Sequence, residues 1–163
     1  MPSRRGFRWD QSNSRLEVQV DGTVAARLDD TGSYLTIPAG DVTITAGNLD
    51  MVAGTLDIQD GGAVTQATTR TTGVTLNTDS GKVTGDDASL AAVTIATHTV
   101  TNSTVAATDN VIITKVSGDV DTLAFVSAVA SGSFNVSVRN NAASAADTTA
   151  FVYNFAVIKS AIT

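Results

Sequence analysis

The side chains that could carry acid–base or metal chemistry are few and scattered along the sequence. The only histidine, His98, lies in the segment VTIATHTVTNS, with no acid close to it in sequence. Alternation along a strand would place it beside neighbouring threonines, so we expect a surface or interface residue. If three copies of the chain met at an axis, three His98 side chains could instead form a metal site.

Acidic residues occur as two adjacent pairs and in one turn: Asp29-Asp30, Asp86-Asp87, and Asp119 with Asp121. Glycosidase chemistry needs two carboxylates that face each other across a cleft, one of them with a pKa raised by burial. Adjacent strand residues face opposite ways and turn residues are solvated, so these acids do not fit that requirement. The turn GDVDT also lacks the ligand spacing of a dedicated calcium loop. We expect solvated turns, without a metal or a cofactor.

The segment DSGKVT contains the Gly-Lys pair of a phosphate-binding loop but not the rest of that motif. Val83 follows Lys82 where the motif needs Ser or Thr, and the surrounding pattern indicates a hairpin instead of a strand followed by a helix. Cysteine is absent, which excludes disulfides and thiolate metal sites. These patterns together predict a protein that is not an enzyme.

The composition favours strands and turns over helices. Threonine occurs 25 times and glycine 13 times among 163 residues, whereas Glu17 is the only glutamate and aspartate occurs 15 times. Threonine suits strands, aspartate suits turns, and glutamate is a common filler of exposed helix surface. We therefore expect an all-β protein. The sequence has no 18-residue apolar run, so we expect no transmembrane helix. Residues 1–20 also lack the apolar run of a signal peptide.

Charge is divided unevenly along the chain. The first fifteen residues hold four arginines and one acid, whereas residues 16–163 hold six basic and fifteen acidic side chains. Residues 1–15 also contain the only tryptophan. Arginine and aromatic side chains carry much of the energy of protein interfaces, so this segment is a candidate anchor arm that orders on a partner. The predicted docking residues are Arg4, Arg5, Phe7, Arg8, Trp9 and Arg15.

Two other interpretations of the same arm stay open. Terminal segments are often disordered when no partner is present. Arginine and aromatic residues also suit nucleic acid, but the acidic remainder of the chain would repel that ligand, so we expect no nucleic-acid partner. After the arm, residues 16–37 alternate apolar and polar types around turn signals at Asp21-Gly22 and Asp29–Gly32. This pattern predicts a small β-meander.

Residues 38–66 contain a glycine at every seventh position, with apolar pairs between the glycines. The apolar gaps run two, five, two, five, which excludes the three-and-four spacing of a coiled coil. Burying two aliphatic side chains per heptad contributes about 3–6 kcal/mol, while ordering seven residues costs about 7–14 kcal/mol. The deficit requires further packing partners, and repeats without room for a core of their own favour identical copies wound around a shared axis. We therefore expect an intertwined trimeric β-stem. Its predicted residues are Gly40, Val42, Ile44, Gly47, Leu49, Met51, Gly54, Leu56, Ile58 and Gly61.

Residues 67–163 show regularly spaced strand patterns separated by polar turns. A hairpin is expected around Thr78–Gly81, with Val74 and Leu76 before the turn and residues 82–84 after it. Five further strands are expected at 93–100, 111–116, 123–129, 134–138 and 150–158. Four of the five phenylalanines lie in this region. The pattern predicts an antiparallel β-sandwich or barrel that holds the main core.

Several segments resemble a C-terminal β-domain found in structural proteins of tailed bacteriophages. The resemblance covers roughly residues 61–160. It is carried, in this order, by GAVTQATTRTTGVTLNTDSGKVT, HTVTNSTVAATDNVII, SAVASGSFNVSVRN and NFAVIK. Similar domains occur in head-decoration proteins or head fibres and in tail fibres. The resemblance implies a trimer, exposure on the virion surface and no catalytic residues.

The residues and the resemblance favour one function and leave a rival. We expect a homotrimeric capsid decoration (cement) protein or head fibre that docks on the major capsid protein by its N-terminal region. Its C-terminal domain would project from the capsid exterior, after synthesis in the host bacterial cytoplasm and without insertion into a membrane. The rival is a tail fibre that recognises a host-surface glycan or protein, with Asn140–Asp147 as a candidate recognition loop.

Overall fold

The computed structural model of the protein describes residues 6–13, 15–20, 23–29, 34–36, 56 and 61–160. All regular secondary structure in these residues is β, which confirms the all-β prediction. The chain divides into two compact units, Met1–Thr55 and Leu56–Thr163.

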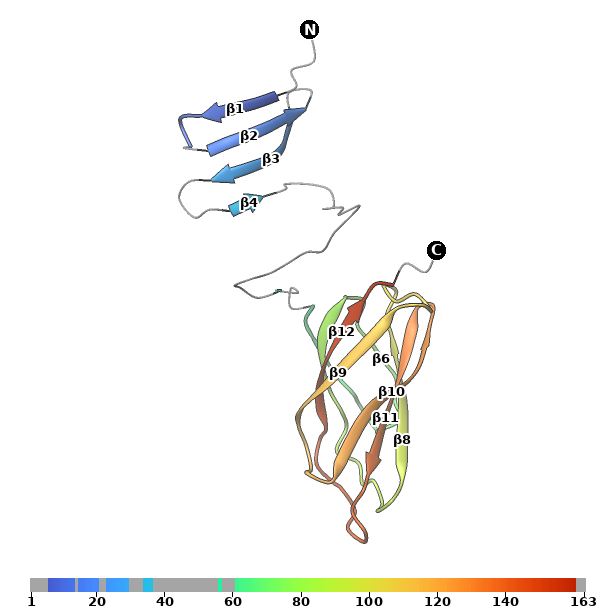
Figure 1. Ribbon diagram of the computed structural model, residues 1–163. Coiled ribbons are helices and arrows are strands. Elements are labelled where there is room, and N and C mark those ends of the chain that lie inside the picture. The colour runs from blue at the N-terminus through green and yellow to red at the C-terminus, as the bar shows by residue number, and fades with distance from the viewer. Residues whose placement is uncertain are drawn as a thin grey trace. The chain divides into compact units, whose positions relative to one another are not determined.

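The N-terminal unit contains one four-stranded antiparallel sheet whose strands follow one another in sequence order (Figure 1). Its strands are β1 (Gly6–Asp10), β2 (Arg15–Val20), β3 (Thr23–Asp29) and β4 (Tyr34–Thr36). β2 and β3 flank Asp21-Gly22, where the sequence predicts a turn. β1 lies inside the segment predicted as an anchor arm, and it pairs with β2. The described part of that arm therefore belongs to the same sheet as the predicted meander.

The C-terminal unit contains two four-stranded sheets. One has the order β10 (Thr122–Ala130), β11 (Ser133–Asn140), β8 (Ile95–Thr101), β6 (Val74–Thr75). The other has the order β5 (Ala63–Thr65), β7 (Ser80–Thr84), β12 (Val152–Ile158), β9 (Asn110–Ser117). The five long strands expected from alternation are all present, with boundaries shifted by a few residues.

Two details of the predicted domain are wrong. Both sheets are mixed instead of antiparallel, because β5 pairs in parallel with β7 and β6 pairs in parallel with β8. The expected hairpin around Thr78–Gly81 does not form either, since β6 and β7 belong to different sheets. The turn between them is an arch from one sheet to the other. The alternation of apolar and polar residues could not distinguish a hairpin from an arch, because both strands bury alternate residues whichever sheet they join.

The core lies between the two sheets and comes from strands of both. Phe134 of β11 and Tyr153 of β12 are at most 1% exposed, and alternate residues of β8 and β12 are buried in the same way. Phe151 and Phe155 join this core, as expected, but Phe125 does not. Its side chain lies on the outer face of the edge strand β10 and is 46% exposed.

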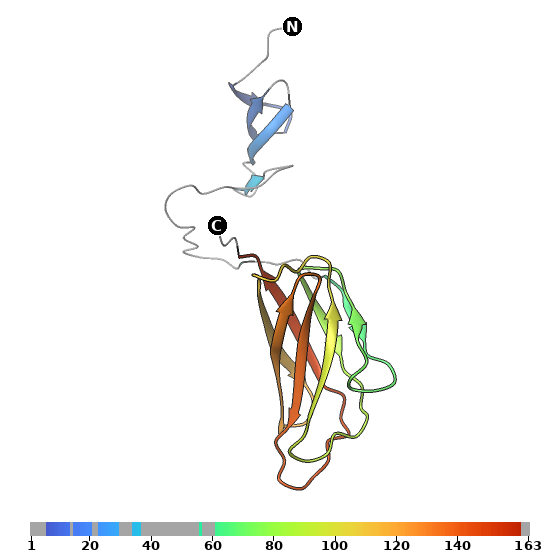
Figure 2. The same ribbon diagram turned by 90° about the vertical axis from the view of Figure 1, so that its right-hand side faces the viewer.

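The loops of the sandwich gather at two opposite ends (Figure 2). Residues 61–62, where the chain enters, lie at the same end as the C-terminal end of β12. The opposite end, called the long-loop end below, contains the segments 66–73, 85–94, 118–121 and 141–151.

Candidate functional site

Two of the predicted docking residues, Phe7 and Trp9, lie on β1 with largely exposed side chains. Phe7 is 78% exposed and Trp9 is 56% exposed. Val18 and Leu16 of β2 stand directly opposite them. Directly paired residues of an antiparallel sheet share a face, so the two aromatic and the two aliphatic side chains lie together.

The register extends this apolar face across all four strands. Val18 pairs with Ala26, Leu16 pairs with Leu28, and Leu28 pairs in turn with the β4 residue Leu35. The positions on what we call the apolar face are thus Phe7, Trp9, Leu16, Val18, Ala26, Leu28 and Leu35. Among these positions the structure describes the side chains of Phe7, Trp9, Leu16 and Val18, and all four are apolar.

The opposite face of the same sheet is polar and internally bonded. The Arg15 guanidinium donates a hydrogen bond of 2.8 Å from Nε to Glu17 and forms ion pairs of 2.7 Å with Glu17 and 3.3 Å with Asp10. Gln19 donates to the other Glu17 oxygen at 2.9 Å. Glu17 is only 3% exposed. The hydrogen bond from Arg15 lowers the pKa of the Glu17 carboxyl.

This alternation separates the predicted docking residues into two groups. Phe7 and Trp9 lie on the apolar face, whereas Arg8 and Arg15 pair with polar residues on the other face. Arg8 is exposed, and Arg15 is part-buried in its ion pairs. Arg4 and Arg5 lie outside the described residues.

Of the predicted stem residues, the structure describes Leu56 and Gly61. The Leu56 side chain is 73% exposed. A Cβ added to Gly61 would lie 1.8 Å from the Ser80 carbonyl oxygen, so only glycine permits the approach of the chain to β7 at this point. The others lie outside the described residues: Gly40, Val42, Ile44, Gly47, Leu49, Met51, Gly54 and Ile58.

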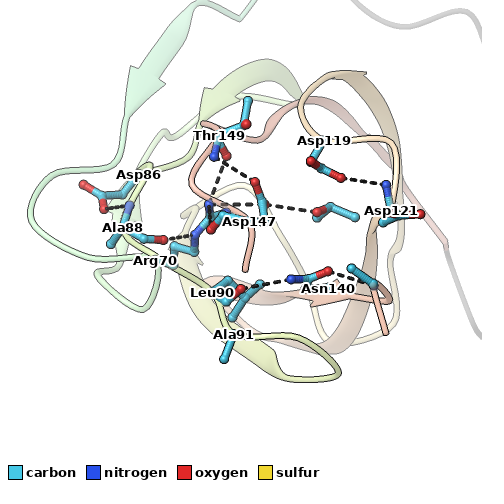
Figure 3. Close-up of polar contacts among 12 residues, drawn as sticks. Arg70, Asp86, Ala88, Leu90, Ala91, Asp119, Asp121, Asn140, Asp147 and Thr149 are labelled. Carbon is cyan, nitrogen blue, oxygen red and sulfur yellow. Dashed lines mark hydrogen bonds and ion pairs between the residues drawn. The ribbon is translucent and has the colours of Figure 1, made fainter. Parts of the chain in front are cut away.

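A buried ion pair holds the long-loop end together (Figure 3). The Arg70 guanidinium lies 3.2 Å from the Asp147 carboxylate, and their side chains are 6% and 1% exposed. The same guanidinium donates to the carbonyl oxygens of Ala88 and, at 3.0 Å, Thr149. The Thr122 hydroxyl donates a hydrogen bond of 3.0 Å to the Asp147 carboxylate. All of the long-loop segments are therefore linked, directly or through Thr122 at the start of β10.

Two buried amides complete this network. Gln66 donates to the carbonyl oxygens of Arg70 and Thr72 at 2.9 and 2.6 Å. Asn140, 1% exposed, donates to the carbonyl oxygens of Leu90 and Ala145 at 3.0 and 2.9 Å. Both ends of the predicted recognition loop Asn140–Asp147 are thus fixed by buried side chains. The residues between them are mostly exposed.

Large apolar side chains are exposed beside this rigid end. They are Val93, Ile95, Val120, Leu123 and Phe125, which we call the loop-end patch. Ile95 and Leu123 stand on either side of Arg139 in adjacent strands, and Val93 has a positive φ of 57°. A β-branched residue rarely adopts that conformation, and such strain often marks a functional segment.

His98 is buried, which corrects the expectation of a surface or interface residue. It is 3% exposed and lies on the inner face of β8 with Ala96 and Val100. Its Nε2 is 2.8 Å from the Tyr153 hydroxyl. Burial lowers the pKa of His98 to about 4 and raises that of Tyr153. A residue in the core of one sandwich cannot meet its copies at an axis, so the alternative of a trimeric His98 metal site is also overturned.

His98 also lines a very small cavity. His98 Nδ1 has no hydrogen-bond partner within the described structure. The cavity has a volume of about 10 Å³ and is lined by residues that include Gln66, Arg70 and Tyr153. This space suits one water molecule and no larger ligand. Among the described residues, no group of three or more His, Cys, Asp or Glu side chains could hold a metal ion.

Sequence reasoning missed the residues that organise the long-loop end. Arg70 and Asp147 are separated by 77 positions and lie in loops that have no periodicity. One signal was present, since Arg70 is the only charged residue in the threonine-rich segment 61–78. A single charge in such a segment could have been tested as a buried ion-pair partner.

Comparisons with protein-family models, with curated proteins and with solved structures found no match to this chain. Within the part of the chain that the structure describes, no helix has the length and apolar character needed to cross a membrane.

Proposed function

We propose that this chain is a structural protein of a bacteriophage virion, a homotrimeric capsid decoration protein or head fibre. Its N-terminal region docks on the major capsid protein at the capsid exterior, and its C-terminal sandwich is displayed. The protein is made in the host bacterial cytoplasm and acts without catalysis. The phage assignment rests on the resemblance of residues 61–160 to virion β-domains.

One observation carries the docking part of the proposal, namely the exposure of the two aromatic side chains Phe7 and Trp9 on the edge strand β1. All the buried hydrophobic residues that form the core cluster lie between Val74 and Val157 in the sandwich. The sandwich therefore has its own core, whereas a small isolated sheet is marginal in water and gains stability from a partner. A sandwich with its own core is suited to display, and exposed aromatic side chains on the N-terminal sheet are suited to attachment to a partner.

Charge supports the choice of the N-terminal region as the attached end. Four of the ten basic residues lie within the first fifteen positions, and the rest of the chain is acidic. Arginine is well suited to bidentate contacts with carboxylates on a partner surface. An acidic displayed part would also keep neighbouring copies apart on a crowded shell.

Binding to capsids tests this proposal. The full chain and a variant that lacks residues 1–15 are mixed with undecorated capsids and sedimented together. The proposal predicts that the full chain sediments with the capsids and that the variant stays in the supernatant. Circular dichroism of the variant checks that its sandwich is folded. Undiminished binding of the shortened chain would remove the docking assignment.

The loop-end patch favours a second candidate function, that of a tail fibre or receptor-binding protein. Exposed apolar side chains beside rigid loops are typical of recognition surfaces. Replacing Leu123 and Phe125 by serine should then reduce attachment of the virion to its host. Ile158→Ser is the matched control, because this equally exposed residue lies at the other end of the sandwich. Unchanged attachment in the Leu123 and Phe125 variant would count against this function.

A further inference from the structure

The sandwich has four sheet edges, and three of them are protected against pairing with another chain. β6 and β5 are only two and three residues long, and β9 contains the exposed Lys115. Short edge strands and edge lysines are common devices that prevent an edge from accepting a further strand. The fourth edge is β10, which has nine residues and contains no charged residue and no proline. Within the described sandwich, β10 is therefore the edge that is open to a further strand.

The first half of β10 is regular and has backbone groups to offer. Its register with β11 is continuous from Thr122 to Val126, and the irregularity follows between Val126 and Ala128. Within the described structure, the backbone groups of residues 123–126 form hydrogen bonds only with β11. An edge strand directs part of its N–H and C=O groups away from its neighbour. These groups lie in a row that an extended segment can pair in series.

Apolar side chains flank this row on both faces of the sheet. Leu123 and Phe125 are 57% and 46% exposed on the outer face. Ala124 and Val126 are partly buried against the core on the inner face. A strand beside β10 would contact all four side chains, whereas a partner on the outer face would leave the row of backbone groups uncovered. The edge therefore fits an extended apolar segment better than a folded surface.

Arg139 indicates the charge of that segment. It lies on β11 directly opposite Leu123, on the same outer face, and its side chain is exposed. Among the residues that the structure describes, its guanidinium has no ion pair or hydrogen bond. A strand added to β10 would lie about 10 Å from β11, two strand spacings away, and extended arginine and glutamate side chains bridge that distance together. Since a guanidinium pairs well with a carboxylate, the segment should carry an acidic residue here.

We propose that Thr122–Val126 of β10 binds an extended, mainly apolar segment of another protein by β-strand addition, with a carboxylate of that segment on Arg139. Backbone hydrogen bonds supply affinity in this mode of recognition, and alternate side chains supply specificity. Leu123, Phe125 and Arg139 are the specificity residues. The inference goes beyond docking by the N-terminal region, because it assigns a binding site to the displayed sandwich.

A labelled peptide of sequence TVTETVT is the probe, and its fluorescence anisotropy with the full chain measures binding. We expect it to bind, and to bind at least about tenfold more weakly when proline replaces one valine, since proline cannot donate to the ladder. Phe125→Ser should weaken binding by about tenfold as well. Ile112→Ser is the matched control, because this residue is 52% exposed on the edge strand β9. It should leave binding unchanged, and circular dichroism checks that both variants are folded.

An exchange of charge tests the role of Arg139. Arg139→Glu should weaken binding of TVTETVT about fivefold, and should bind TVTKTVT more tightly than the unaltered chain does. The inference is overturned if TVTETVT does not bind, or if Phe125→Ser and Arg139→Glu bind it as tightly as the unaltered chain. Light scattering covers the remaining occupant. If Phe125→Ser lowers the mass of the free protein, a second copy of this chain occupies β10, and the inference is overturned as well.

Discussion

Trp9 and Leu16 stand directly opposite each other in β1 and β2, on the face of the sheet that lacks the Arg15–Glu17 ion pair. The strands thus place an exposed aromatic surface and a satisfied polar surface back to back. The proposed docking of the N-terminal region draws on this exposed aromatic surface.

The buried ion pair of Arg70 and Asp147 should be essential to the stability of the sandwich. Arg70→Ala leaves the Asp147 carboxylate buried without its cation, which costs about 3–5 kcal/mol of unfolding free energy. Urea denaturation followed by circular dichroism measures the loss. Lys82→Ala is the control, because Lys82 is exposed on β7 and its removal should change stability by less than about 0.5 kcal/mol. Equal stability of the two variants would show that the network contributes little.

His98 should make the sandwich less stable at mildly acidic pH. Its pKa is about 4 in the folded state, below the ordinary value of 6.5, so the unfolded chain takes up the proton first as the pH falls. Stability is therefore complete above pH 6.5 and decreases down to about pH 4, by about 3 kcal/mol in total.

Urea denaturation at a series of pH values measures this dependence. His98→Gln has no titrating imidazole and should lose the slope between those pH values, whatever its absolute stability. Asp109, whose pKa is lowered chiefly by the Ala106 backbone hydrogen bond, titrates in the same direction but only below its ordinary value of 3.8. A slope that persists unchanged in His98→Gln would assign the effect to other groups.

Gly61 should not tolerate a side chain. Gly61→Ala places a methyl group 1.8 Å from the Ser80 carbonyl oxygen, so the entering chain must move away from β7 at a cost of about 1–3 kcal/mol. Thermal unfolding of the variant measures the loss. In Gly73→Ala the nearest atom would be 3.2 Å away, and the effect should be clearly smaller. The prediction fails if the two variants melt together.

The sandwich should fold without the N-terminal unit. A fragment of residues 61–163 retains the whole core cluster and the long-loop network, so we expect a single cooperative unfolding transition. Circular dichroism and light scattering of the fragment test this, with the full chain as reference. A fragment that is unfolded or only partly cooperative would mean that the core depends on residues before Gly61.

The strands of the sandwich could be predicted because several of them bury alternate residues. Phe134–Val138 and the strand around Tyr153 show this period clearly, and the structure has them in place. The sheet to which each strand belongs could not be predicted in the same way. The pairing of β6 with β8 and of β7 with β12 depends on an arch whose residues resemble those of a hairpin turn.

Three site features were misplaced or missed by sequence reasoning, each for a different reason. His98 was placed with threonines, although Ala96 and Val100 share its phase and indicate the inner face. The Arg70–Asp147 contact joins two loops across 77 positions, and no local pattern encodes such a contact. The apolar face of the N-terminal sheet needed the register as well, because only the pairing of Trp9 with Leu16 shows which residues share a side.

The most direct test of the central proposal is the location of the sandwich on virions that carry this protein. Antibodies raised against residues 61–163 and labelled with gold should decorate the heads at regular intervals, and the label should disappear from virions assembled with a chain that lacks residues 1–15. Label confined to the tail tips would contradict the decoration function and favour a receptor-binding fibre.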